Sequence, residues 1–207
     1  MISAKAVKEL RELSGAGMMD CKKALQESNG DTKKAMEVLR KNGIAKAQKK
    51  VGRSALDGVI IPYIHPGSKL GVLLEVNCET DFVARTEGFQ GFCKDVAMHI
   101  AATSPISIKR EDIPEDVVET EKTIFREQSK KSDKSDEIIE KMITGRMNKF
   151  YQENVLLEQS FVKNPDISIE GLLTETIAKL GENVSIARFS RFQLGENAPK
   201  AESSDSE

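Results

Sequence analysis

The sequence has little of what membrane insertion, secretion or disulfide bonding needs. No apolar run approaches the ~20 residues of a membrane-spanning helix, and Met1 to Lys5 do not begin a basic segment followed by an apolar block. Its three cysteines, Cys21, Cys78 and Cys93, are an odd number and lie far apart among apolar neighbours. We therefore expect buried thiols in a reducing, cytoplasmic compartment, and no membrane segment.

Motifs for catalysis or cofactor binding are also missing. The sequence has no P-loop, no dinucleotide-binding glycine pattern and no nucleophile elbow. The cysteines and the two histidines, His65 and His99, do not have the spacing of a metal site. His99 follows Val96 and Cys93 at helical spacing, which favours a core histidine over a catalytic base. We expect a binding protein that is not an enzyme and that holds neither a metal nor a cofactor.

Charge is distributed unevenly along the 207 residues. Residues 1–53 carry thirteen Lys or Arg against six Asp or Glu, although the whole chain has a net charge of -2. A basic front of this kind can meet nucleic acid or an acidic protein, and charge alone leaves both partners open.

Apolar residues at spacings of three and four predict three short helices in this basic front. Their expected bounds are Ser3 to Ser14, Met18 to Asn29, and Asp31 to Asn42-Gly43. Leu13 is expected on the inward face of the first helix. Because such short helices are unstable alone, they must pack into one module, followed by a basic connector over residues 45–53 that can itself be helical.

A change of period marks a mixed α/β core. Two β-rich runs, residues 59–64 and 70–77, flank a Pro-Gly turn and predict an antiparallel hairpin. An apolar stripe over residues 89–100 predicts a helix that covers this hairpin. A further helix is expected around residues 169–180, and the alternation in residues 184–189 predicts a third strand of the same sheet.

Residues 109–150 are mostly charged and contain two apolar seams, which predict a helical hairpin turning at the polar residues 129–136. From Gly195 the acidic tail is expected to be disordered. The predicted fold class is α+β: a three-helix, ubiquitin-associated-like module joined to an α/β core with a three-stranded antiparallel sheet and a helical hairpin insertion. The expected divisions are 1–53 (module and linker), 54–108 (first part of the core), 109–150 (helical hairpin), 151–194 (remainder of the core) and 195–207 (tail).

The turn after the second predicted strand, Thr80-Asp81-Phe82-Val83, admits two interpretations. In the first, Thr80 caps a helix, Asp81 is a favourable acid in the first turn and Phe82 is a core residue. In the second, Phe82 is an aromatic anchor held outward on a rigid corner, and Asp81 orders the corner or repels phosphate. Physical reasoning alone favours the first, although the spacing is compatible with both.

Six strings, in order along nearly the whole chain, closely resemble bacterial-type elongation factor Ts. They are L-R-E-L-S-G-A-G-M-M-D-C-K-K-A-L (10–25), E-V-N-C-E-T-D-F-V-A (75–84), G-F-Q-G-F (88–92), A-M-H-I-A (97–101), E-K-M-I-T-G-R-M (140–147) and A-K-L-G-E-N-V (178–184).

This resemblance implies a guanine-nucleotide exchange factor for elongation factor Tu, the GTPase that delivers aminoacyl-tRNA. In the family the turn corresponding to Thr80, Asp81, Phe82 and Val83 presses against the GTPase domain and disturbs its Mg²⁺ and phosphate site. The resemblance thus reverses the preference between the two interpretations and favours Phe82 as a wedge. We expect no cofactor and no direct contact with nucleic acid, and the lack of a transit peptide favours the bacterial cytoplasm.

Further contact residues follow from the same resemblance. The module matches the family at residues that face the GTPase domain: Arg11, Met18, Met19, Lys22 and Lys50. Either methionine can instead pack inward at the start of its helix. Leu180 and Gly181 resemble part of the same contact surface.

The chain departs from longer family members in size, because it shows neither a second copy of the α/β subdomain nor a further C-terminal helix. A homodimer that restores the second copy is therefore a hypothesis. Two other functions remain open. One is an adaptor whose three-helix front binds another protein, and the other is an RNA-binding protein, which the missing tryptophan and the lack of an aromatic β-face disfavour.

Overall fold

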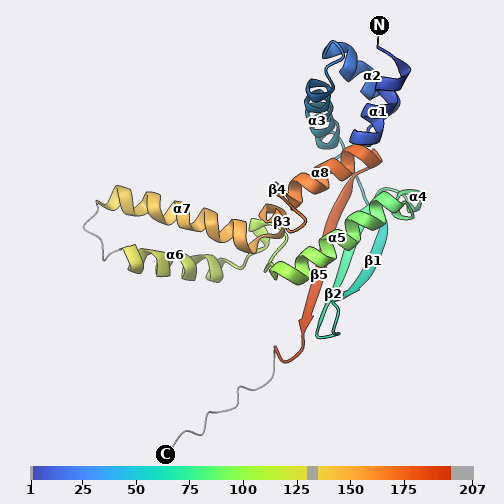
Figure 1. Cartoon of the computed structure of the whole chain (residues 1–207). Coiled ribbons are helices and arrows are strands. Elements are labelled where there is room, and N and C mark those ends of the chain that lie inside the picture. The colour runs from blue at the N-terminus through green and yellow to red at the C-terminus, as the bar shows by residue number, and fades with distance from the viewer. Residues whose placement is uncertain (1, 130–134, 197–207) are drawn as a thin grey trace, which may run out of the picture.

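A computed structural model describes residues 2–129 and 135–196 of the chain. Figure 1 shows three parts: a helical module at the N-terminal end, a sheet with helices beside it, and a helical hairpin that projects away from the sheet. The predicted α+β class is confirmed, including the three-stranded antiparallel sheet and the hairpin. None of the described helices is long and apolar enough to cross a membrane.

The N-terminal module consists of α1 (Ala4–Ser14), α2 (Met18–Glu27) and α3 (Thr32–Gln48). Ser3 and Asp31 cap α1 and α3, because their side chains accept hydrogen bonds from backbone N–H groups three residues ahead. Small and aliphatic side chains form its buried core: Val7, Leu10, Cys21, Ala24, Leu25 and Ala35. The expectation that Leu13 points inward is wrong, since Leu13 is 70% exposed.

The third helix is longer than the sequence predicted. It continues through Asn42-Gly43 to Gln48 instead of ending there, and it packs against α8 (Ile169–Leu180). A Cβ atom at Gly43 would lie 3.4 Å from Cβ of Ala178, so the glycine allows two helices to approach closely and does not stop one. Tertiary packing here outweighs the low helix propensity of glycine.

The sheet has the strand order β1-β2-β5, with both pairs antiparallel. Its strands are β1 (Asp57–Ile64), β2 (Leu70–Cys78) and β5 (Val184–Gln193). Alternate residues of β2 point into the core, where Val72, Leu74 and Val76 are buried under α5 (Glu87–Thr103). The predicted apolar stripe of α5 is buried, as expected.

The opposite face of the sheet is exposed and carries apolar side chains towards one end, while Glu75 and Arg188 form an ion pair farther along it. Register places Ile64, Gly71 and Phe192 in one row across the three strands, and Pro62 and Leu73 in the next. Among these, Ile64, Leu73 and Phe192 are 62%, 48% and 68% exposed.

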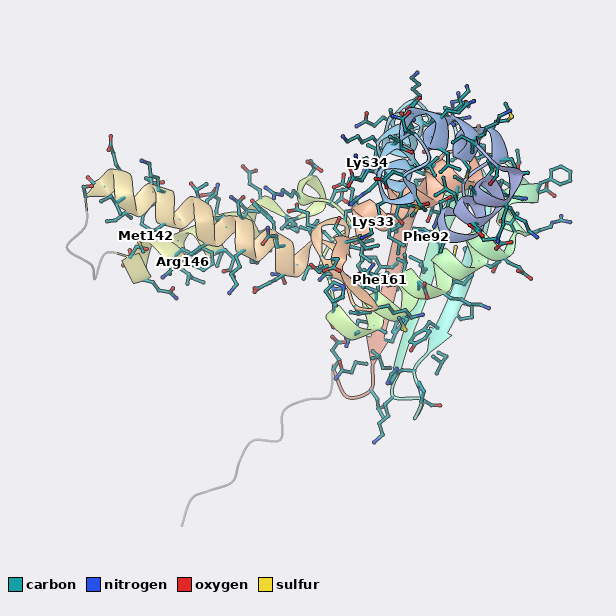
Figure 2. All side chains as sticks on the ribbon, turned by 45° about the horizontal axis from the view of Figure 1, so that its top comes forward. Lys33, Lys34, Phe92, Met142, Arg146 and Phe161 are labelled. Atoms are coloured by element: carbon teal, nitrogen blue, oxygen red, sulfur yellow. The ribbon has the colours of Figure 1, made fainter. Side chains whose placement is uncertain are left out.

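The projecting hairpin consists of α6 (Glu115–Ser129) and α7 (Asp136–Asn154), preceded by the short 3-10 helix η1 (Arg110–Asp112). Figure 2 shows Arg146 on α7 beside α6, where its guanidinium lies 5.7 Å from the ring centroid of Phe125 and donates to Oε1 of Gln128 at 2.6 Å. The predicted polar turn falls on residues 129–136, of which 130–134 lie outside the described residues.

A second, two-stranded sheet was not predicted. After the 3-10 helix η2 (Leu156–Glu158), the strands β3 (Ser160–Phe161) and β4 (Asn164–Ser168) pair and lead into α8. Strands of this length are too short for a periodic pattern to reveal them. The predicted disordered tail, apart from Gly195 and Glu196, lies outside the described residues.

Candidate functional site

The corner after β2 forms a four-residue helix, α4 (Asp81–Ala84). Thr80 caps it, because its Oγ1 accepts from the N–H of Val83 at 3.4 Å. Asp81 occupies the first turn, where a negative charge is favourable, and it pairs with Arg85 at 2.8 Å. The first interpretation of this turn is therefore right for Thr80 and Asp81.

Phe82, however, is not a core residue, since it is 80% exposed. Residues two apart in a helix differ by about 200° around its axis, so they point to nearly opposite sides. Ala84 is 4% exposed and belongs to the core, and Val83 packs against the same core. Burying these two residues turns Phe82 outward, as the second interpretation requires. Its proposed role as an anchor stays a prediction.

Hydrogen bonds from a distant corner hold this turn. Glu182 follows α8, and its carboxylate accepts from the backbone N–H of Thr80 at 3.0 Å and from the Thr80 hydroxyl at 2.8 Å. In the opposite direction, Glu79 accepts from the backbone N–H of Asn183 at 2.7 Å. Sequence analysis missed Glu79 and Glu182, because the bonded residues are 102 to 104 positions apart. Both acids do lie inside the two strings that resemble elongation factor Ts, which was the available signal.

A buried thiol supports the corner from behind. The Sγ of Cys78 donates to the carbonyl oxygen of Thr80 at 3.1 Å. Burial, together with the Glu182 carboxylate, raises the pKa of the Cys78 thiol, which keeps it protonated as a donor. All three cysteines are free and buried, as the sequence predicted.

Leu180 and Gly181 lie beside the same corner. Gly181 ends α8 in the left-handed conformation, with φ of 76°, which a glycine adopts without strain. A Cβ atom at Gly88 of α5 would lie 3.6 Å from Cδ2 of Leu180, so this leucine packs next to the first turn of α5. Leu180 and Gly181 thus lie directly before Glu182, whose carboxylate accepts hydrogen bonds from Thr80.

The predicted residues of the module lie on a separate surface. Met18 and Met19, at the start of α2, are 46% and 65% exposed, so neither packs fully inward. Arg11 and Lys22 are exposed, and Lys50 is half-buried just after α3. The module reaches the corner through α8, because α3 packs against α8 and a Cβ atom at Gly15, just after α1, would lie 3.7 Å from Cε of Lys179.

His99 has a structural role in the described core. It is fully buried, its Nε2 lies 2.9 Å from Oε1 of Gln159, and its Nδ1 accepts from the backbone N–H of Val162. These contacts require a neutral ring with the proton on Nε2. The expectation of a satisfied core histidine is confirmed. No group of three or more His, Cys, Asp or Glu residues with a metal-binding arrangement occurs in residues 2–129 and 135–196.

An exposed aromatic side chain on a hydrogen-bonded corner is the geometry of a surface that binds another macromolecule. Comparison with known proteins identifies the family of the chain. The sequence model of the family described as "Elongation factor TS" matches residues 2–196. The chain therefore belongs to the elongation factor Ts family, and this membership supports a role in translation elongation.

Curated relatives named "Elongation factor Ts" agree with this result. The one from Carboxydothermus hydrogenoformans is 55% identical over 202 residues, which cover 98% of this chain and 93% of the relative. The one from Geotalea daltonii is 57% identical over 202 residues, with 98% and 94% covered. The one from Thermosipho melanesiensis is 57% identical over 196 residues, with 95% and 100% covered. These relatives have nearly the same length as this chain, so they share its short form.

Proposed function

We propose that this protein is a guanine-nucleotide exchange factor, which binds GDP-bound elongation factor Tu in the cytoplasm and promotes GDP release during translation elongation. The observation that carries the proposal is Phe82, a large apolar side chain that is 80% exposed on a corner fixed by hydrogen bonds at both ends. A partner that covers this ring would remove it from water and gain binding energy from its burial.

The mechanism is a coupling of two binding equilibria. GDP is held in a GTPase largely by Mg²⁺ and by groups around its phosphates. A factor that binds more tightly when those groups are displaced weakens GDP binding by the same free energy. No covalent bond is broken in this exchange, so the proposal needs no catalytic residue, metal or cofactor in this chain.

Each predicted contact has a physical task in this scheme. Phe82 provides apolar binding energy, and the carboxylate of Asp81, 44% exposed beside it, opposes a bound anion nearby. The module residues Arg11, Met18, Met19, Lys22 and Lys50, together with Leu180 and Gly181, supply the remaining contact with the GTPase.

Release of labelled GDP from purified elongation factor Tu tests the proposal. Wild-type protein should accelerate release strongly, and Phe82→Ala should reduce that acceleration by about tenfold or more, since an aromatic anchor is worth ~2 kcal/mol or more. Ile138→Ala, which removes another exposed apolar side chain on α7, is the matched control and should behave as wild type. An unchanged release rate with the wild-type protein would refute the exchange function.

The same assay separates the two alternatives. An adaptor would bind the GTPase or another protein without changing the release rate. An RNA-binding protein would retain labelled RNA and leave the GTPase unaffected.

We also propose that two copies pair through the exposed face of the sheet. That face carries exposed apolar side chains on all three strands, including Ile60, Ile64, Leu73 and Phe192. In a two-fold dimer the same patch of both copies meets, so pairing through this face would remove these side chains from water. Sedimentation at micromolar concentration should show a dimer that Leu73→Glu dissociates and Ile138→Glu does not. A wild-type monomer would exclude the dimer without affecting the exchange proposal.

A further inference from the structure

Every backbone and side-chain polar group of Thr80 is used inside the fold. Its N–H and hydroxyl both donate to Glu182, at 3.0 and 2.8 Å. Its carbonyl oxygen accepts from Cys78 at 3.1 Å and from the N–H of Ala84 at 3.3 Å. Because Thr80 is also the cap of α4, rotating the helix would break several of these bonds together.

A second set of bonds ties the same region to the linker from the module. Glu79 accepts from the N–H of Asn183 at 2.7 Å, and its other oxygen lies 3.7 Å from the guanidinium of Arg53. The side-chain amide of Asn183 donates to the carbonyl oxygen of Arg53 at 2.7 Å. Two adjacent corners, one before α4 and one after α8, therefore each hold a backbone N–H of the other with a glutamate.

The strengths of these contacts differ. Hydrogen bonds to a partly buried carboxylate are charge-assisted, and one carboxylate that accepts two of them also fixes direction. The pair between Asp81 and Arg85 is the other charged contact of α4, but its side chains are 44% and 79% exposed, where ion pairs contribute little. Of the two charged contacts, Glu182 therefore restrains α4 more strongly, in addition to the packing of Val83 and Ala84.

We propose that Glu182 is a positioning residue for nucleotide exchange, which acts through Thr80 to hold Phe82 at a fixed place relative to Leu180 and Gly181. This inference rests on the proposed exchange function. A wedge displaces groups of its partner only if it does not itself move aside, so a loosened α4 would leave the complex able to form but slow to release GDP.

The absence of tryptophan from the sequence allows a direct test of position. Phe82→Trp introduces a single fluorescent reporter at the corner. Adding Glu182→Gln retains the side-chain shape but removes the negative charge. The bonds to Thr80 then lose their charge assistance, and the amide nitrogen can only donate to the hydroxyl, which also accepts from the N–H of Val83. We expect the fluorescence anisotropy of the reporter to fall while the far-ultraviolet circular dichroism stays unchanged.

Glu158→Gln is the matched control for that measurement. Glu158 also accepts two hydrogen bonds from one residue, Arg110, but at the base of the helical hairpin. In the Phe82→Trp protein, Glu158→Gln should leave the fluorescence anisotropy unchanged. Equal anisotropy in the Glu182→Gln and Glu158→Gln proteins would overturn the inference.

The kinetics of GDP release, measured with the native Phe82 in place, distinguish positioning from a general loss of structure. Glu182→Gln should lower the maximal rate of GDP release at saturating factor by about tenfold, with the half-saturating concentration changed by about twofold at most. Glu158→Gln, again the control, should retain the wild-type maximal rate. Thr80→Val lacks the hydroxyl that donates to Glu182 and caps α4, so its loss and that of Glu182→Gln should combine to less than their sum in the double variant.

The outcomes separate the two proposals. If wild-type protein does not accelerate release, the exchange function fails, and the anisotropy still reports whether Glu182 fixes the corner. If wild-type protein accelerates release and Glu182→Gln reaches the same maximal rate, the exchange function stands and the positioning role is wrong.

Discussion

The N-terminal module and the α/β core differ in how they are stabilised. The module buries small and aliphatic residues, among which Leu10 and Leu25 are the largest. The core buries aromatic and branched side chains from helices and strands together, including Phe89, Leu74 and Ile100. Since burial of large apolar groups provides most of the stabilising free energy, the module is the weaker unit.

The last turn of α3 links the two parts. Ala47 is 1% exposed and belongs to the core cluster, although it lies on a helix of the module. We therefore expect the module, with its smaller core, to rely on the contact between α3 and α8 more than the α/β core does. A binding surface divided between them, as proposed above, needs this contact to keep its parts in register.

Truncating the largest buried side chain should give the greatest effect. Phe89→Ala should lower the free energy of unfolding by about 3–5 kcal/mol, because it removes a fully buried ring and leaves a cavity in the core. Leu25→Ala should cost about 2–5 kcal/mol, and that loss should be confined to the module. Urea unfolding followed by circular dichroism, with amide exchange to locate each transition, would measure both. If both variants shift one common transition, the two parts are a single cooperative unit.

Crowding the junction should have a smaller effect. Gly43→Leu places a branched side chain against Ala178 and should cost about 1–3 kcal/mol through overpacking. The module should then detach more often, and trypsin should cleave faster at Lys49, Lys50 and Arg53. Gly145→Leu on α7, where a Cβ would meet no atom within 4 Å, is the control and should leave cleavage unchanged. Equal cleavage of both variants would show that the junction tolerates the bulk.

Acidification should produce the smallest difference in stability between the module and the core. Burial lowers the pKa of His99 from 6.5, so below that value the unfolded chain binds a proton that the folded chain does not. The free energy of unfolding of the core should therefore fall as the pH drops from 7 towards 5, by at most ~1.4 kcal/mol per pH unit.

The module contains no histidine, so the free energy of its local opening should not show this dependence on pH. His99→Gln should flatten the dependence for the core. Amide exchange at several pH values would follow both regions, and an equally steep dependence in the His99→Gln protein would assign the effect to other groups.

Much of the fold was predictable from short-range patterns. The two β-rich runs around the Pro-Gly turn predicted the β1-β2 hairpin, the apolar stripe predicted α5, and the structure confirms both. The expected end of α3 at Asn42-Gly43 was wrong. A glycine can end a helix or allow a second helix to pack closely against it, and only the position of α8 distinguishes the two. The pairing of β3 with β4 left no periodic signal.

The caps at Ser3, Asp31 and Thr80 follow from the sequence alone, because both partners of each hydrogen bond lie in one turn of chain. The outward position of Phe82 and the hydrogen bonds from Glu182 to its corner follow only from the folded chain. The first depends on which side of α4 meets the core, and the second joins residues 102 positions apart. Contacts of that kind arise from the folding of the whole chain, so no local pattern encodes them.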